Sequence, residues 1–129
     1  MAYLTTIEGK ADSIRIAREA GIPRQFLLKI LHTLKMNKHL ESARGIGGGY
    51  WLAEEPGQIS LYDVVGLFEN VEDFAICPFG SEGCRRETKC PLHEGWSAAR
   101  SQFITFLQDT TFETFKEAEF KDIFPNASN

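Results

Sequence analysis

The sequence predicts a mainly α-helical fold with one small β-hairpin, and three patterns carry that prediction. Residues 13–20 and 23–36 both place apolar side chains at helical spacing, with a glycine between the two runs. Two short strand-like runs, 40–43 and 50–53, flank a tip with four glycines, which is typical of a hairpin. A further helical run, 96–109, carries apolar residues in a heptad-like seam. Helix, tight turn, helix and hairpin is the order of a winged helix-turn-helix domain, here followed by a long helix.

The composition is that of an ordinary globular protein. Of the 129 residues, 43% are hydrophobic and 25% are charged, which is enough for one domain with a core and excludes disorder, collagen and a coiled-coil rod. The chain has no apolar run long enough for a membrane span, and its N-terminus lacks the basic and apolar regions of a signal peptide. We therefore expect a cytoplasmic protein with no membrane partner.

Charge is divided along the chain. The formal net charge is −4, but residues 1–50 carry eight Lys and Arg against four Asp and Glu, whereas residues 51–129 carry six against fourteen. A basic half beside an acidic half suits a module that reads nucleic acid, coupled to a regulatory module. Chance asymmetry on a solvated surface is the alternative interpretation.

The chain is expected to have three parts. Residues 1–69 form the winged helix-turn-helix domain, residues 70–95 form an irregular segment with all three cysteines, and residues 96–129 form the long helix and a C-terminal helix. The irregular segment has no apolar periodicity, so it needs something to order it.

Capping signals define the first two helices. Asp12 or Ser13 caps a helix that runs to Ala20, and Gly21 ends it. Pro23 suits the first turn of the second helix, because its missing N–H would be unpaired there.

The second helix has two distinct faces. One face is expected to lie against a core and consists of Phe26, Leu27, Ile30, Leu31 and Leu34. The opposite, outward arc consists of Gln25, Leu28, Lys29, His32 and Met36. An outward Leu28 and Met36 would be unusual on a solvated face but useful on a helix that lies against a partner.

The hairpin tip has the sequence ARGIGGGY, with Arg44 at its base. Glycine lets the backbone of such a tip approach another surface closely. Glycine-rich loops also hold phosphates in nucleotide-binding folds, but the strand-then-helix context and the Lys-Ser/Thr pair of those folds are missing here.

Further along the chain, Ser60 and Asp63 have the spacing of a capping box that opens a helix over 61–69. The seam of the long helix consists of Trp96, Ala99, Phe103, Phe106 and Leu107. A final helix is expected to start at Thr111 and to carry Phe112, Phe115 and Phe120.

The cysteines and one histidine form a ligand-like series, Cys77-x6-Cys84-x5-Cys90-x2-His93. Three thiolates and an imidazole suit zinc or an iron–sulfur cluster. No two of these cysteines have the C-x2-C spacing that structural zinc sites favour, so the spacing favours a cluster. Three unrelated cysteines, and a His93 that is bonded only to solvent or backbone, are the alternatives.

Four stretches carry a family resemblance. They are IAREAGIPRQFLLKIL (16–31), ARGIGGGYWLA (43–53), ISLYDVV (59–65) and CPLHEGW (90–96). Together they resemble the Rrf2 family of winged-helix transcription regulators, and within it the IscR-like iron–sulfur regulators. The resemblance implies a homodimer that binds double-stranded DNA, with the helix 96–109 at the dimer interface and a cluster that controls operator binding.

The resemblance also implies a ligand set. Cys77, Cys84, Cys90 and His93 match the IscR-like pattern for a two-iron two-sulfur cluster. Other members complete a four-iron four-sulfur cluster with a carboxylate from the partner's first helix. This chain is expected to keep only Met1–Leu4 of that helix, which favours His93 as the fourth ligand. A structural zinc, or a thiol/disulfide redox switch in the same fold, is the alternative function.

The helix over 23–36 is the expected DNA-reading element. Base edges are expected to meet Gln25, Leu28, Lys29 and His32. Phosphates are expected to meet Arg24 and Lys35, while Arg44 enters the minor groove beside Gly45 and Tyr50.

Two departures from the family pattern concern the same helix. Leu28 replaces a Glu, and a Leu contacts thymine methyl groups instead of accepting from cytosine. Lys38 stands where Gly commonly closes the helix, so Asn37 is expected to supply the left-handed cap.

No enzyme is predicted. The chain has no Ser/His/Asp set, no phosphate loop in context and no carboxylate pair near a histidine, so we expect neither catalysis nor a small-molecule substrate.

Overall fold

The computed structural model describes residues 1–74, 77 and 90–123, and these residues form two compact units. The first unit comprises Met1–Ile59 and the C-terminal segment from Thr111, and the second comprises Ser60–Thr110. Each unit has its own apolar core.

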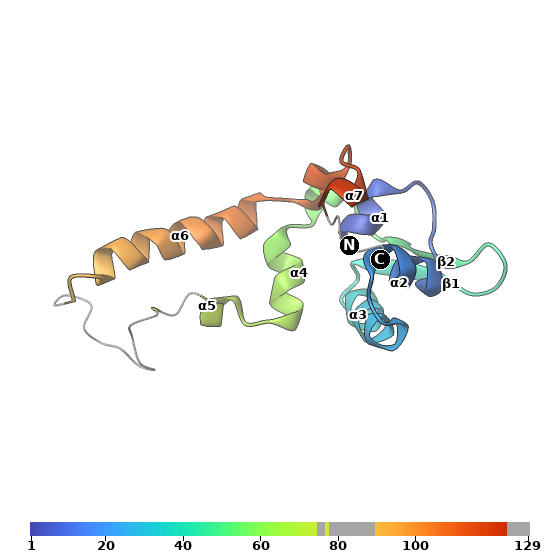
Figure 1. Cartoon of the computed structure of the whole chain (residues 1–129), viewed down its shortest axis with the longest axis horizontal. Helices are drawn as coiled ribbons and strands as arrows, with labels where there is room; N and C mark the ends of the chain where they lie inside the picture. Colours follow the sequence, from blue (N-terminus) through green and yellow to red (C-terminus); the bar gives the residue numbers. More distant parts are fainter. Residues whose placement is uncertain (75–76, 78–89, 124–129) are drawn as a thin grey trace. The chain divides into compact units, whose positions relative to one another are not determined.

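The first unit holds the helix-turn-helix and the hairpin (Figure 1). Its helices are α1 (Ala2–Thr6), α2 (Ser13–Ala20), α3 (Arg24–Met36) and α7 (Phe120–Ile123), with short 3-10 helices η1 (Pro56–Gln58) and η2 (Phe112–Phe115). Strands β1 (Leu40–Ala43) and β2 (Gly49–Leu52) pair antiparallel, with Leu40 opposite Leu52 and Ala43 opposite Gly49. The second strand therefore begins one residue earlier than the predicted run 50–53.

The core of the first unit lies between the helices and the base of the hairpin. Its largest fully buried side chains are Leu34, Leu40 and Ile59. The C-terminal segment joins this core through Phe112, which is buried and whose N–H donates to the carbonyl of Ile59 at 3.0 Å. The single final helix predicted from Thr111 is wrong, because η2 and α7 are separate short helices.

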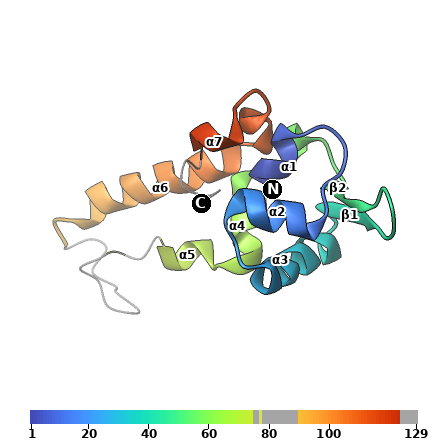
Figure 2. The same ribbon diagram turned by 45° about the vertical axis from the view of Figure 1, so that its right-hand side comes forward.

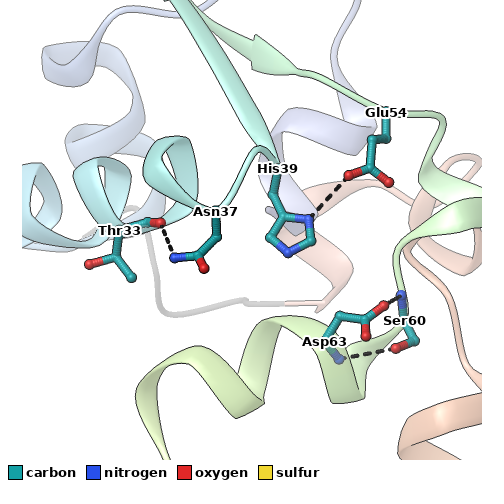
Figure 3. Close-up of polar contacts among 6 residues, drawn as sticks. All are labelled: Thr33, Asn37, His39, Glu54, Ser60 and Asp63. Atoms are coloured by element: carbon teal, nitrogen blue, oxygen red, sulfur yellow. Dashed lines mark hydrogen bonds and ion pairs between the residues drawn. The ribbon is translucent and has the colours of Figure 1, made fainter.

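The second unit consists of α4 (Leu61–Phe68), α5 (Val71–Phe74) and α6 (His93–Asp109), as Figure 2 shows. The predicted capping box of α4 is confirmed, because Asp63 N donates to Ser60 Oγ at 3.0 Å and Ser60 N donates to Asp63 Oδ2 at 3.2 Å (Figure 3). The helix α4 packs against both α5 and α6. Among the side chains described in this unit, Val71 and Leu107 are buried.

Two boundaries in the second unit differ from the sequence prediction. The short helix α5 lies in the stretch predicted to be irregular, where Asn70 Oδ1 accepts the Glu72 N–H and opens it. The long helix α6 begins at His93 and not at Trp96. Within the ranges 1–74 and 90–123 and residue 77, no helix has the length and apolar character needed to cross a membrane.

Candidate nucleic-acid interface and cysteine segment

The turn between α2 and α3 forms as the sequence predicts. Asp12 is the N-cap of α2, and its Oδ1 accepts the Arg15 N–H at 2.7 Å. Gly21 ends the helix in the left-handed region at φ 67°, and the Ile22 N–H donates to Ala17 O at 3.0 Å. These local bonds fix the direction in which the chain enters α3. Pro23 is the N-cap of α3 and not its first residue, a shift of one position.

One face of α3 packs on the core, but the predicted face was too wide. Leu27, Leu31 and Leu34 are buried, whereas Phe26 has 59% of its surface exposed. At 100° per residue, Phe26 lies a quarter turn away from Leu27, so it falls on the flank of the helix and not on its core face. The prediction that Phe26 faces the core is wrong.

The outward arc of α3 is open to solvent. Gln25, Lys29, His32 and Met36 are exposed, whereas Leu28 is half-buried. Leu28 lies about 100° from Leu27, on the same flank as Arg24 and Lys35. A helix with an exposed, mostly polar arc and an apolar Leu28 at its edge can place both kinds of group against a major groove.

Two hydrogen bonds hold the flank of α3 to its neighbours. Arg24 Nε donates to Ser13 Oγ at 3.2 Å, and this serine belongs to α2 and is buried. Lys35 Nζ donates to Ser42 Oγ at 2.7 Å, and this serine belongs to β1. Both predicted phosphate-contacting cations therefore also connect α3 to the elements beside it.

The end of α3 differs from the prediction. Asn37 has φ −93°, so it is not a left-handed cap; its Nδ2 instead donates to Thr33 O at 2.8 Å (Figure 3). Lys38 takes the left-handed conformation at φ 65°. The amide of Asn37 is bonded within the last turn of the helix, so the left-handed residue is the next one along the chain.

His39 closes the base of the hairpin. Its carbonyl accepts the Ala53 N–H at 3.0 Å, and its Nδ1 lies 3.6 Å from Glu54 Oε1 (Figure 3). This nitrogen is buried and makes no hydrogen bond with the residues that the structure describes. The side chain of His39 is only 14% exposed.

The hairpin is attached to the segment before α2. Ala11 N donates to Tyr50 O at 3.2 Å, and Tyr50 N donates to Ala11 O at 2.8 Å. Gly49 allows this approach, because a Cβ at that position would lie 2.8 Å from the carbonyl carbon and oxygen of Ala11. Lys10, which the sequence analysis did not single out, places its Nζ 4.6 Å from the centre of the Trp51 ring.

A cavity of about 550 Å³ lies between the hairpin tip and the start of α3. It brings together Arg24 and Arg44, along with Gly45 and Tyr50, all four of which were predicted to contact DNA. The outward residues of α3 do not line it. The candidate interface thus has two parts, an exposed helix face and a groove lined by two arginines. The one acidic residue among the described residues of the groove, Asp12, uses its carboxylate as the N-cap of α2, and arginines favour a phosphate as the partner.

The cysteine segment is described only in part. Cys77 and Cys90 are half-buried free thiols, and His93 is exposed at the start of α6, where its N–H donates to Cys90 O at 3.2 Å. Cys84 lies outside the described residues. Among the residues that are described, no three His, Cys, Asp or Glu side chains form a metal-binding group.

The donor chemistry of this segment fits an iron–sulfur cluster. Two free thiols are described and neither is used in a disulfide, and an imidazole follows one turn after the second. Thiolates with one imidazole are known terminal ligands of such clusters.

Comparison with known proteins identifies the family. The model of a family described as "Rrf2: Iron-dependent Transcriptional regulator" matches residues 1–118. The chain belongs to the Rrf2 family. An HTH-type transcriptional regulator of Aquifex aeolicus is 30% identical over 128 residues, covering 97% of this chain and 89% of the relative. The HTH-type transcriptional regulator IscR of Cronobacter sakazakii is 28% identical, covering 98% of this chain and 78% of the relative.

Solved structures of Rrf2-like regulators share the fold. The global cysteine regulator CymR of B. subtilis has a TM-score of 0.72 at 22% identity, covering 92% of this chain and 88% of that one. The IscR of T. potens has a TM-score of 0.66 at 23% identity, covering 92% of this chain and 79% of that one. The predicted family and winged-helix fold class are confirmed, and this Rrf2 protein is a transcription regulator and not an enzyme.

Proposed function

We propose that the protein is a homodimeric regulator that binds double-stranded DNA, with operator binding controlled by an iron–sulfur cluster, most simply of the two-iron two-sulfur type. The observation that carries the proposal is the exposed outer face of α3 beside the Arg24–Arg44 cavity, in a chain of the Rrf2 family. A helix of this kind enters the major groove while the hairpin reaches the neighbouring backbone or minor groove.

DNA recognition is divided between the two parts of the interface. Gln25, Leu28, Lys29 and His32 on α3 meet base edges, and Leu28 offers an apolar contact to thymine methyl groups. Arg24 and Lys35 contact phosphates, while Arg44 approaches the minor groove beside Gly45 and Tyr50. The bonds from Arg24 to α2 and from Lys35 to β1 limit the freedom of both cations before DNA arrives.

Dimerisation uses the exposed seam of α6. Phe103 and Phe106 are 42% and 57% exposed, whereas Leu107 is buried within the unit. Two aromatic side chains on the open face of a helix bury apolar area when a second copy covers them. A Phe106→Glu variant is expected to elute as a monomer in size-exclusion chromatography with light scattering. Phe68, which is 43% exposed on α4, gives a matched control as Phe68→Glu.

The cluster ligands are Cys77, Cys84, Cys90 and His93. When bound, such a cluster supplies a cross-link between these four side chains that depends on iron supply and is sensitive to oxidation. The ligand set comes from the stretch between α5 and the start of α6, so a bound cluster would restrict the segment that leads into the dimer helix. Loss of that restriction would change the spacing of the two recognition helices in the dimer and with it the affinity for operators.

The first experiment is purification without oxygen, followed by a visible absorption spectrum and assays of iron, sulfide and zinc. Equal iron and sulfide at two per subunit support the proposal and its ligand set. Four iron per subunit would demote His93 and reopen the search for the fourth ligand. One zinc per subunit without sulfide would favour the structural zinc site over the cluster. A metal-free protein with a disulfide would favour the thiol switch.

A second experiment separates cluster control from folding. The variant with all three cysteines changed to Ala is expected to remain a folded dimer, because no described cysteine lies in either apolar core. Its affinity is measured by fluorescence anisotropy on a duplex that the wild-type protein enriches from a random pool. Affinity identical to that of the cluster-loaded wild type would contradict control by the cluster.

A further inference from the structure

The tip of the hairpin presents a single side chain. Residues 45–48 are Gly-Ile-Gly-Gly, and Gly48 N donates to Gly45 O at 3.0 Å. Gly47 has φ 78°, the value of the second central residue of a type II turn. Ile46 therefore occupies the first central position, at the outermost point of the hairpin.

Ile46 makes no packing contact that hides it from solvent. Its relative exposure is 110%, the highest among the exposed large apolar residues of the described chain, whereas Ile14 on α2 is 62% exposed. The glycines beside it hold the turn without offering any side chain for Ile46 to pack on. At Gly48 a Cβ would lie 2.3 Å from Ala43 O, so the loop backbone folds closely over the end of β1. Fully exposing an isoleucine contributes nothing to this fold.

The surroundings of Ile46 indicate what covers it. Arg44 and Gly45 precede it, and the same tip lines the cavity that Arg24 shares. The first fifty residues carry eight basic and four acidic side chains, which favours a polyanion over an acidic or apolar partner. A turn with one side chain is also thin enough for a groove about 6 Å wide.

We propose that Ile46 enters the minor groove of DNA and packs its apolar side chain against the deoxyribose walls and base edges, next to Arg44. The inference deepens the proposed function and rests on it. Apolar side chains of this kind are used by minor-groove proteins, where they fill the groove or separate base steps. Arg44 supplies charge and Ile46 supplies apolar contact, so the two residues contribute to binding by different physical means.

The two contributions should differ in how the binding affinity depends on salt concentration. Ile46→Ala is expected to weaken binding about tenfold, which corresponds to about 1.4 kcal/mol. The dependence of its affinity on salt stays that of the wild type, because no counterion is released by an isoleucine. Arg44→Ala weakens binding and lowers the salt slope by about one. Ile46→Val, which keeps a branched apolar side chain, retains most of the affinity.

The test uses fluorescence anisotropy at several salt concentrations, with a duplex that the full-length wild-type protein enriches from a random pool. Ile14→Ala is the matched control, and it should bind as the wild type does. Methylation of adenine N3 by dimethyl sulfate reports on the minor groove, and with both proteins at saturating concentration the protection at the hairpin contact should be weaker in Ile46→Ala than in the wild type. Thermal unfolding of Ile46→Ala should match the wild type.

The outcomes distinguish this inference from the proposed function. If the wild-type protein enriched no duplex, both would fail together. If it bound, and Arg44→Ala weakened binding while Ile46→Ala did not, the apolar contact would be overturned and the regulator would stand. Weakened binding by Ile46→Ala with unchanged adenine N3 protection would place Ile46 outside the minor groove and overturn the inference as well.

Discussion

Lys35 Nζ donates a hydrogen bond to Ser42 Oγ at 2.7 Å, and this bond joins α3 to the first strand of the hairpin. Both side chains are accessible, so the bond adds little to stability. Its effect is on geometry, because it fixes the position of the helix proposed for the major groove relative to the hairpin proposed for the minor groove.

The two partners of this bond should differ in DNA binding. Lys35→Ala is expected to weaken binding to specific and random duplexes alike and to lower the salt slope by about one, because it removes a phosphate-contacting charge. Ser42→Ala is expected to leave the slope unchanged, since Lys35 keeps its charge. Anisotropy titrations over a range of salt concentrations measure both. An equal reduction of the slope in both variants would contradict a phosphate contact by Lys35.

Lys38 offers a gain in stability. It adopts φ 65°, a conformation that costs an L-residue with a Cβ roughly 1–2 kcal/mol and costs glycine nothing of that kind. Lys38→Gly is therefore expected to raise the free energy of unfolding by about 0.5–1 kcal/mol after the greater chain entropy of glycine is deducted. Urea unfolding followed by circular dichroism measures the change.

The neighbouring residue provides the control for Lys38. Asn37 has φ −93° and bonds Thr33 O, so Asn37→Gly should lower stability. If Asn37→Gly were the stabilising change and Lys38→Gly were not, the left-handed position would be Asn37, as the sequence alone predicted.

The elements set by local chemistry could be predicted from the sequence. The Asp12 cap, the Gly21 end of α2 and the Ser60–Asp63 capping box each depend on residues no more than four or five positions apart. Short-range bonds of this kind leave a direct trace in residue type and spacing. The ends of α2 and the start of α4 could be placed from them, and the hairpin from its glycine-rich tip.

The features that depend on distant neighbours could not be predicted. Phe26 matches the apolar period but lies on the flank, and its exposure depends on which elements pack beside α3. The bonds from Arg24 to Ser13 and from Lys35 to Ser42 join residues that are 11 and 7 positions apart. For the cysteines, residue type and spacing indicated the ligand chemistry. The structure adds only that the thiols of Cys77 and Cys90 are free.

The N-terminal amine predicts a dependence of stability on pH. In a chain that begins at Met1, burial lowers the pKa of the α-amino group from 8.0 to about 6. Between pH 6 and 8 the unfolded chain binds more protons than the folded one, so the free energy of unfolding rises with pH. Over that window the rise is about 2 kcal/mol, and the gain is lost as pH falls through the folded pKa.

Acetylation of the same amine is the control for the pH dependence. The acetylated chain has no proton to bind at this position, while every other group of the chain is unchanged. The slope of unfolding free energy against pH, from urea titrations at pH 6, 7 and 8, should be smaller in the acetylated chain. Equal slopes would show that the amine does not titrate differently in the two states.

Gly49 tests the attachment of the hairpin. It has φ 136°, and a Cβ there would lie 2.8 Å from backbone atoms of Ala11, which have no flexible side chain to move aside. Gly49→Ala must therefore displace the strand and disturb the two hydrogen bonds between Ala11 and Tyr50, at a cost of at least about 2 kcal/mol. Thermal unfolding measures the loss, and hydrogen exchange at the Tyr50 amide should become faster.

The matched substitution for Gly49→Ala is Gly45→Ala in the same hairpin. Gly45 has φ 86°, but a Cβ there meets nothing within 4 Å, so its replacement carries only the backbone strain of about 1–2 kcal/mol. The difference between the two variants isolates the contact with Ala11 from the conformational preference of glycine. Equal destabilisation, with unchanged exchange at Tyr50, would mean that the hairpin does not depend on its attachment to Ala11. A larger loss in Gly49→Ala, together with weakened DNA binding, would show that this attachment holds Arg44 in place beside Arg24.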